Sequence, residues 1–139
     1  MPAKNIYHDA VRDALVADGW TITHDPLFIS FGRDRLYVDL AADRPTLGAE
    51  RNGELIAVEI QSFLSRSSIA DLQQAVGQYV IYRLVLEETH PGRTLFLAVS
   101  QEVYADLIGT RLGETVFRRL GIRAAVCDMT QRRIVEWTS

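Results

Sequence analysis

The spacing of apolar residues divides the first half of the chain into one helix and several short strands. Apolar positions three and four residues apart predict a helix over residues 6–18, and Gly19 is a C-terminal stop signal. Alternation of polar and apolar residues then predicts strands, separated by turn signals such as Asp25-Pro26 and Asn52-Gly53. The predicted strands cover residues 20–24, 27–31, 36–41, 47–51 and 55–60. We therefore expect a meander of paired strands here.

The second half contains a long amphipathic helix, predicted over residues 69–88. Its expected buried face consists of Leu72, Val76, Tyr79, Val80, Leu84 and Val85. The continuous apolar run over residues 95–99 is typical of a strand that is covered on both faces. The last predicted elements are helices over 101–108 and 115–120 and strands over 123–127 and 133–137. This order favours a single α/β domain over residues 1–139, with a mixed β-sheet flanked by helices.

Two of the predicted strands carry a carboxylate inside an apolar run. Asp39 lies in the segment YVDLA, and Glu59 lies in the segment IAVEIQSF. A buried charge is costly unless something pairs with it, and two neighbouring carboxylates also repel each other. A divalent cation would neutralise both side chains. The alternative is that both are outward-facing strand residues, which the alternation of a strand permits.

The residues that follow Glu59 extend this candidate site. Glu59 and Gln61 share one strand face because side chains alternate, whereas Ile60 points to the opposite, covered face. If Asp39 lies on the adjacent strand, two carboxylates and the main-chain carbonyl of Ile60 form a set of hard oxygen ligands. Such ligands suit Mg²⁺ or Mn²⁺, which can activate a water and stabilise charge on a phosphodiester.

Composition and charge narrow the class of protein. The chain has 139 residues, 47% of them hydrophobic, and a net charge of −3, which argues against a general nucleic-acid coat. No apolar run is long enough for a membrane span and no secretory signal follows Met1, so we expect a cytoplasmic location. Cys127 is the only cysteine, which excludes an internal disulfide, and its apolar surroundings favour a buried, inert thiol.

The arrangement of Asp39, Glu59-x-Gln61 and a long helix resembles the PD-(D/E)xK nuclease superfamily. The resemblance implies a restriction-endonuclease-like core of helix, strand meander, helix and strand. It also implies catalytic roles for Asp39, Glu59 and Gln61, and a metal ion held by Asp39, Glu59 and Ile60.

The long helix adds a second motif to this resemblance. Its segment from Gln78 to Tyr82 resembles the QxxxY motif of the RecB-like branch, in which both residues lie beside the metal site and contact nucleic acid. The four-residue spacing places Gln78 and Tyr82 on one helix face. The alternative is an ordinary exposed glutamine and a half-buried tyrosine.

A narrower resemblance extends over nearly the whole chain. The segments that carry it are MPAKNIYHD, DGWTITHDPL, VDLAA, IAVEIQSF, DLQQAVGQYVIYR and LFLAVSQEVY. In their order and spacing they are similar to the XisH-like proteins, which are called fdxN-element excision controlling factors. The resemblance implies a role in programmed DNA-element excision or its control, together with an XisI-type partner protein. It does not imply a settled catalytic activity.

The sequence departs from the nuclease pattern at Gln61, where the motif has a lysine. Lysine there would orient the attacking water and stabilise negative charge, whereas glutamine donates hydrogen bonds without a charge. Lys4 is the only lysine in the chain. Three interpretations therefore stay open. The first is a Mg- or Mn-dependent endonuclease that acts on DNA, and the second is a non-catalytic regulator that uses the nuclease fold to bind DNA or the XisI-type partner. The third is a purely structural interaction domain, which would bind no metal.

Two further acids are candidates for the same site. Asp9 lies beside His8 on the first predicted helix, whose acidic residue sometimes supports the metal in the superfamily that the sequence resembles. Glu50 would be a third carboxylate near Asp39. The alternatives are a surface helix residue for Asp9 and a hairpin-edge residue for Glu50. The unpaired edge of the expected sheet also favours a homodimer.

Overall fold

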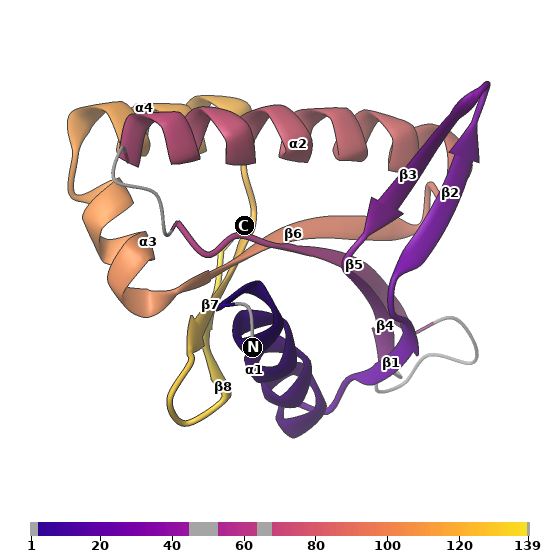
Figure 1. Ribbon diagram of the computed structural model, residues 1–139, viewed down its shortest axis with the longest axis horizontal. Helices are drawn as coiled ribbons and strands as arrows, with labels where there is room; N and C mark the ends of the chain where they lie inside the picture. The colour runs from indigo at the N-terminus through magenta and orange to yellow at the C-terminus, as the bar shows by residue number, and fades with distance from the viewer. Residues whose placement is uncertain (1–2, 45–52, 64–67, 139) are drawn as a thin grey trace.

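The computed structural model describes residues 3–44, 53–63 and 68–138 of the chain, drawn in colour in Figure 1. The helices are α1 (Ala3–Ala17), α2 (Ser68–Thr89), α3 (Gln101–Ile108) and α4 (Arg111–Leu120). The strands are β1 (Thr21–His24), β2 (Leu27–Phe31), β3 (Asp34–Val38), β4 (Leu40–Arg44), β5 (Glu54–Ile60), β6 (Arg93–Ser100), β7 (Ala124–Asp128) and β8 (Arg133–Trp137).

Six of these strands form one mixed sheet in the order β1-β4-β5-β6-β7-β8. The central strands β5, β6 and β7 run parallel, whereas β1, β4 and β8 pair antiparallel to their neighbours. Parallel neighbours need a crossover, which α2 provides between β5 and β6, and α3 with α4 between β6 and β7. The predicted class, an α/β fold with a mixed sheet flanked by helices, is confirmed.

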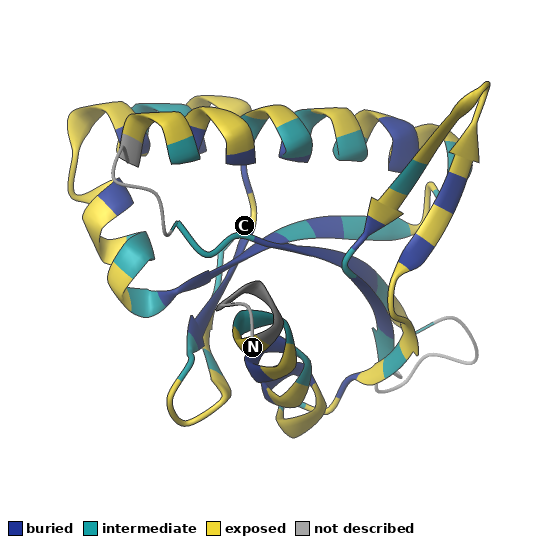
Figure 2. Cartoon of the chain, viewed as in Figure 1, coloured by how far each residue is buried: buried dark blue, intermediate teal, exposed yellow. Residues whose placement is uncertain are grey.

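The sheet separates two apolar layers. Helix α1 covers one face, where its residues Val11 and Leu15 pack with Trp20, Leu40 and Ile60. Helices α2 and α4 lie over the other face (Figure 1). Figure 2 shows that the central strands are buried along most of their length, as expected for strands covered on both sides.

Tyr79 anchors α2 to the sheet and is 1% exposed. Its hydroxyl donates to the carbonyl oxygen of Leu95 at 3.1 Å and accepts from the backbone amide of Arg123 at 3.1 Å. The ring also lies under the guanidinium of Arg83, with 5.2 Å between the guanidinium carbon and the ring centroid. One side chain of α2 therefore ties the starts of β6 and β7 together.

Strands β2 and β3 form a separate two-stranded hairpin that projects beside α2 (Figure 1). The sequence predicts one continuous strand over residues 36–41, and this prediction is wrong at its centre. The chain bends at Asp39, so that β3 pairs with β2 while β4 joins the large sheet. The apolar alternation continues through the bend, and this is why the pattern does not reveal it.

Other differences concern element ends and helix faces. The helix predicted from residue 115 begins at Arg111, because the side chain of Thr110 caps it by accepting from the amide of Gly113. Leu84, expected on the buried face of α2, is 56% exposed. The strand predicted over 47–51, Asn52 and Glu50 lie outside the described residues.

None of the helices in the described ranges has the length and apolar character needed to span a bilayer.

We expect Tyr79→Phe to lower the free energy of unfolding by about 1–3 kcal/mol, because it leaves a carbonyl and an amide of the sheet without their shared partner. Urea unfolding followed by circular dichroism measures this change. The matched control is Tyr37→Phe, since Tyr37 is 54% exposed and should lose a few tenths of a kcal/mol at most. Equal effects of the two substitutions would contradict the role assigned to Tyr79.

Candidate metal centre at the end of β5

The candidate site begins with an interrupted row of backbone hydrogen bonds. The amide of Gln61 donates to the carbonyl oxygen of Ala98 in β6 at 3.0 Å, so the amide of Ile60 points to the other side, toward β4. Strand β4 begins only at Leu40, opposite Val58, and offers no backbone acceptor there. The carboxylate of Asp39 replaces the missing backbone acceptor, since the amide of Ile60 donates to Asp39 Oδ2 at 2.8 Å.

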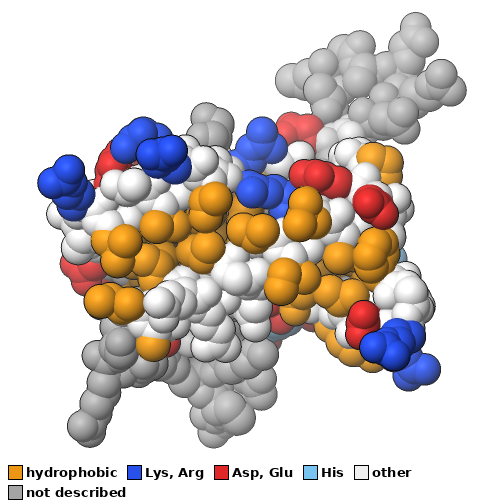
Figure 3. All heavy atoms as spheres, turned by 90° about the horizontal axis from the view of Figure 1, so that it is seen from above, with side chains coloured by type: hydrophobic (Ala, Val, Ile, Leu, Met, Phe, Trp, Pro, Cys, Tyr) orange, Lys and Arg blue, Asp and Glu red, His pale blue; other side chains and the backbone are white. Residues whose placement is uncertain are grey.

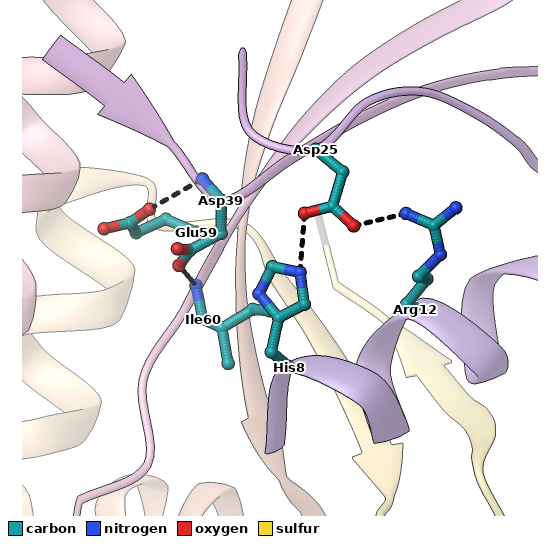
Figure 4. Close-up of polar contacts among 6 residues, drawn as sticks. All are labelled: His8, Arg12, Asp25, Asp39, Glu59 and Ile60. Atoms are coloured by element: carbon teal, nitrogen blue, oxygen red, sulfur yellow. Dashed lines mark hydrogen bonds and ion pairs between the residues drawn. The ribbon is translucent and has the colours of Figure 1, made fainter. Parts of the chain in front are cut away.

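Glu59 completes a reciprocal contact with Asp39. Its Oε1 accepts a hydrogen bond from the backbone amide of Asp39 at 3.2 Å, and only 6% of the residue is exposed. Figure 4 shows the Glu59 carboxylate directed at the backbone amide of Asp39, and the Asp39 carboxylate directed at the backbone amide of Ile60. The structure thus brings the two acids together, which excludes the alternative of unrelated outward-facing strand residues.

Two residues of α2 lie near the end of β5. Gln61 Nε2 donates to Gln78 Oε1 at 2.5 Å, which links the end of β5 to α2. Tyr82 lies one helical turn after Gln78 and is half-buried. Burial raises the pKa of Tyr82 above its ordinary value, and the negative charges of Glu59 and Asp39 raise it further. Tyr82 is therefore close enough to the carboxylate pair to respond to both charges, whereas Gln78 is connected to the end of β5 through Gln61.

The donor set fits a hard divalent cation. Asp39 Oδ1 has no hydrogen-bond partner among the described residues, and the Glu59 carboxylate and Ile60 carbonyl are the other oxygen ligands predicted from the sequence. Mg²⁺ is commonly held by one or two carboxylates with water completing its octahedron. Within the described ranges, no group of three or more His, Cys, Asp or Glu residues surrounds this point. Water would supply the remaining ligands.

Of the two additional candidate acids, only Asp9 lies in the described part of the chain, and it does not extend this set of ligands. Asp9 is exposed on α1 and makes no hydrogen bond or ion pair within the described part of the chain, and Glu50 lies outside it. His8, the neighbour of Asp9, instead contacts Asp25 Oδ1 through Nε2 at 2.7 Å.

Sequence reasoning missed the partner of His8. Asp25 also binds Arg12, so two residues of α1 share one carboxylate in the β1–β2 turn (Figure 4). The four-residue spacing of His8 and Arg12 on the helix was the available signal, because it places both on one face. Nothing in the local sequence marks Asp25 as the residue that both contact.

The comparison with protein-family models finds a match over almost the full length of the chain. The model of the XisH protein family matches residues 1–135. The chain belongs to the XisH family. A comparison with curated proteins finds no match.

Two solved structures resemble the chain closely. An XisH family protein from Nostoc punctiforme is 35% identical, with a TM-score of 0.87 over 96% of this chain and 99% of that one. An fdxN element excision controlling factor protein from Anabaena variabilis is also 35% identical, with a TM-score of 0.86 over 97% and 99% of the two chains. The arrangement of helices around the sheet is thus that of known XisH structures.

Replacing Glu59 by Gln should lower the pKa of Tyr82 toward its ordinary value, because one of the negative charges that disfavour the phenolate disappears. Part of the elevation should remain, since burial is its largest cause. A pH titration of ¹³C-labelled tyrosine rings by NMR resolves the individual residues. Tyr82→Phe identifies the resonance.

The matched control is Glu136→Gln. Burial and then the charge of Glu136 raise the pKa of Tyr104, so this variant should lower the pKa of Tyr104 and leave that of Tyr82 unchanged. If Glu59→Gln leaves the titration of Tyr82 where it was, the carboxylate does not lie beside that phenol.

Proposed function

We propose that the chain is a controlling factor in DNA-element excision and that it cleaves DNA with a Mg or Mn ion at Asp39 and Glu59. Family membership and the similarity to an fdxN element excision controlling factor support the role in excision. The observation that carries the cleavage proposal is the meeting of two carboxylates at the end of β5, beside α2. The resemblance of this arrangement to the PD-(D/E)xK pattern supports it further.

Each residue has a distinct part in this proposal. Asp39 and Glu59, with the carbonyl of Ile60, hold the ion, which when bound stabilises charge on the phosphodiester and lowers the pKa of a water ligand. Gln61 orients the attacking water with the donor or acceptor that its contact to Gln78 leaves available. Gln78 and Tyr82 border the DNA side, where the phenol of Tyr82 can donate to a phosphate oxygen, since a tyrosine is protonated at neutral pH and the raised pKa of Tyr82 only extends that range.

The absence of a lysine at position 61 bears on the rate. A lysine ammonium stabilises developing negative charge, whereas the Gln61 amide offers only a dipole. The chain's only lysine, Lys4, precedes the part of α1 whose side chains the structure describes. We therefore expect slow cleavage that depends strongly on the ion.

Asp39→Asn should abolish most cleavage while preserving the bend, because the amide oxygen can still accept from the backbone of Ile60. We expect manganese-dependent cleavage of double-stranded and single-stranded DNA to fall at least about a hundredfold, as when a charged transition-state partner is lost. Calorimetry with MnCl₂ should show weakened binding in the same variant.

Asp106→Asn is the control for removing one negative charge, since Asp106 is an exposed acid on α3. It should leave both cleavage and manganese binding unchanged. Absence of cleavage by the native chain, or equal activity of the two variants, would rule out the catalytic role of Asp39.

A second candidate function is a non-catalytic regulator that binds an XisI-type partner or DNA. A band of exposed apolar side chains favours a partner protein: Ile69, Ile81 and Leu84 on α2 and Leu112 and Leu120 on α4 are between 38% and 56% exposed. Figure 3 shows hydrophobic side chains gathered in this band across the face above α2. Contiguous apolar surface of this kind is typical of interaction sites.

Strands β1 and β8, the edges of the large sheet, also offer pairing positions for a second copy.

Replacing Ile81 and Leu84 together by Ser should reduce association with an XisI-type partner at least about tenfold, because both side chains would lie near the centre of the contact. Co-purification and equilibrium binding measure the loss. Val135→Ser is the control, since Val135 is 50% exposed on β8. Unchanged association would remove α2 from the interface, and sedimentation of the chain by itself measures whether it forms a homodimer.

A further inference from the structure

A second polar hollow lies between α2 and the starts of β6 and β7. It has a volume of about 280 Å³, and three arginines contribute to its walls: Arg83 from α2, Arg93 from β6 and Arg123 from the residues before β7. The carboxylate pair lies instead where β5 ends and β4 begins. The two sites therefore occupy opposite ends of the parallel strands.

Two of the arginines are held in place by the backbone. Arg83 Nη1 donates to the carbonyl oxygen of Leu120 at 2.7 Å, where α4 ends, and its guanidinium stacks over Tyr79. Arg93 Nη1 donates to the carbonyl oxygens of Ile56 and Ala42 at 2.8 and 3.3 Å. Each guanidinium has five N–H donors, so these bonds fix its orientation and leave donors for another group.

Arg123 differs, because its side chain has no hydrogen bond or ion pair within the described part of the chain. Its backbone is fixed by the bond from its amide to the hydroxyl of Tyr79. The side chain of Arg123 thus extends from a fixed backbone position at the wall of the hollow, and its guanidinium donors are available to a ligand. The buried side chain of Tyr79 therefore helps to position both Arg83 and Arg123.

The charge in the hollow is strongly unbalanced. Glu87 is the one carboxylate among its lining residues, against three guanidinium groups. Burial lowers the pKa of Arg93 below its ordinary value, and its Nε is buried without a hydrogen-bond partner. A partly desolvated cation of this kind is stabilised by a nearby anion.

The remaining lining residues indicate the kind of anion. The hydroxyl of Thr94 adds a polar group, while Leu86, Leu95 and Pro91 form an apolar wall. Arginine guanidinium groups match the oxygens of phosphate in geometry and charge. The volume admits more than a bare ion, and the apolar wall suits an organic substituent.

We propose that this hollow, formed by Arg83, Arg93 and Arg123, binds the phosphate group of a phosphate monoester, with the organic part against Leu86, Leu95 and Pro91. The ligand is either a small nucleotide-like phosphate or the 5′-phosphate end of a DNA strand. This site does not depend on the carboxylate pair and needs no divalent cation.

The experiment is calorimetric titration of the native chain in EDTA with inorganic phosphate, AMP and adenosine. AMP should bind more tightly than inorganic phosphate because it adds contacts with the apolar wall, and adenosine should not bind measurably. Arg123→Ala should weaken AMP binding about tenfold or more, as expected for a lost hydrogen bond between charged groups. Glu87→Gln should strengthen it severalfold, because it removes the one carboxylate that lines the hollow.

Arg119→Ala is the matched control, since Arg119 is an exposed arginine on α4 outside the hollow. It should leave the affinity unchanged, which separates a local contact from a general effect of net charge. A pair of oligonucleotides with a 5′-phosphate or a 5′-hydroxyl distinguishes the sources: tighter binding of the phosphorylated strand than of AMP identifies a DNA end, and the reverse identifies a small molecule.

Two results would overturn the proposal. One is the absence of AMP and phosphate binding by the native chain. The other is binding that Arg123→Ala and Glu87→Gln leave at the native affinity. The gain expected for Glu87→Gln is informative in itself, because a variant that merely damaged the fold would not bind more tightly.

Discussion

The backbone at the end of β5 needs an acceptor that the neighbouring strand cannot provide. A buried amide without a hydrogen bond is costly, and the amide of Ile60 faces the position where the chain bends away between β3 and β4. The Asp39 carboxylate meets this need, and Glu59 in return accepts from the amide of Asp39. The two acids thus supply hydrogen-bond acceptors where the pairing of backbone groups between the strands is interrupted. The departure of the β2–β3 hairpin from the large sheet depends on this exchange.

The same constraint explains why two like charges lie together in a largely apolar environment. Each carboxylate accepts a hydrogen bond from a backbone amide, which compensates for part of its lost contact with water. Each has a second oxygen beyond the bond described, and α2 lies opposite with Gln78 and Tyr82. Because these backbone amides need acceptors, two carboxylates are brought together beside a helix that carries polar groups. That concentration of negative charge is the physical basis for proposing an ion at this position.

Periodicity predicts most elements of the fold because the relevant information is local. Strand β2 and helix α3 have the bounds that alternation and helical spacing indicate, and Gly19 ends α1 with a φ of +95°, a conformation that glycine adopts easily. The bend at Asp39 could not be predicted this way, since both β3 and β4 continue the same alternation. It depends on which strands pair, and pairing is set by contacts between distant residues. Leu84 was misassigned for a similar reason, because an apolar residue on the outer face of α2 does not differ locally from one on the inner face.

The candidate site was predictable in part for a chemical reason. A carboxylate within an apolar strand is unusual enough to mark Asp39 and Glu59, and the shared face of Glu59 and Gln61 follows from alternation alone. The cluster of Arg83, Arg93 and Arg123 has no comparable signal, because arginines are common on solvated surfaces and these three lie far apart in the chain.

Tyr79 shows how the two ends of the sheet are connected through α2. Its hydroxyl joins the starts of β6 and β7 while Gln78, the preceding residue, bonds to Gln61 at the end of β5. Neighbouring positions on a helix point about 100° apart, so one turn of α2 reaches both regions. Acidic groups gather where β5 ends, and basic groups gather where β6 and β7 begin. A shift of this one turn of α2 would therefore alter the contact at the end of β5 and the contacts at the starts of β6 and β7 together.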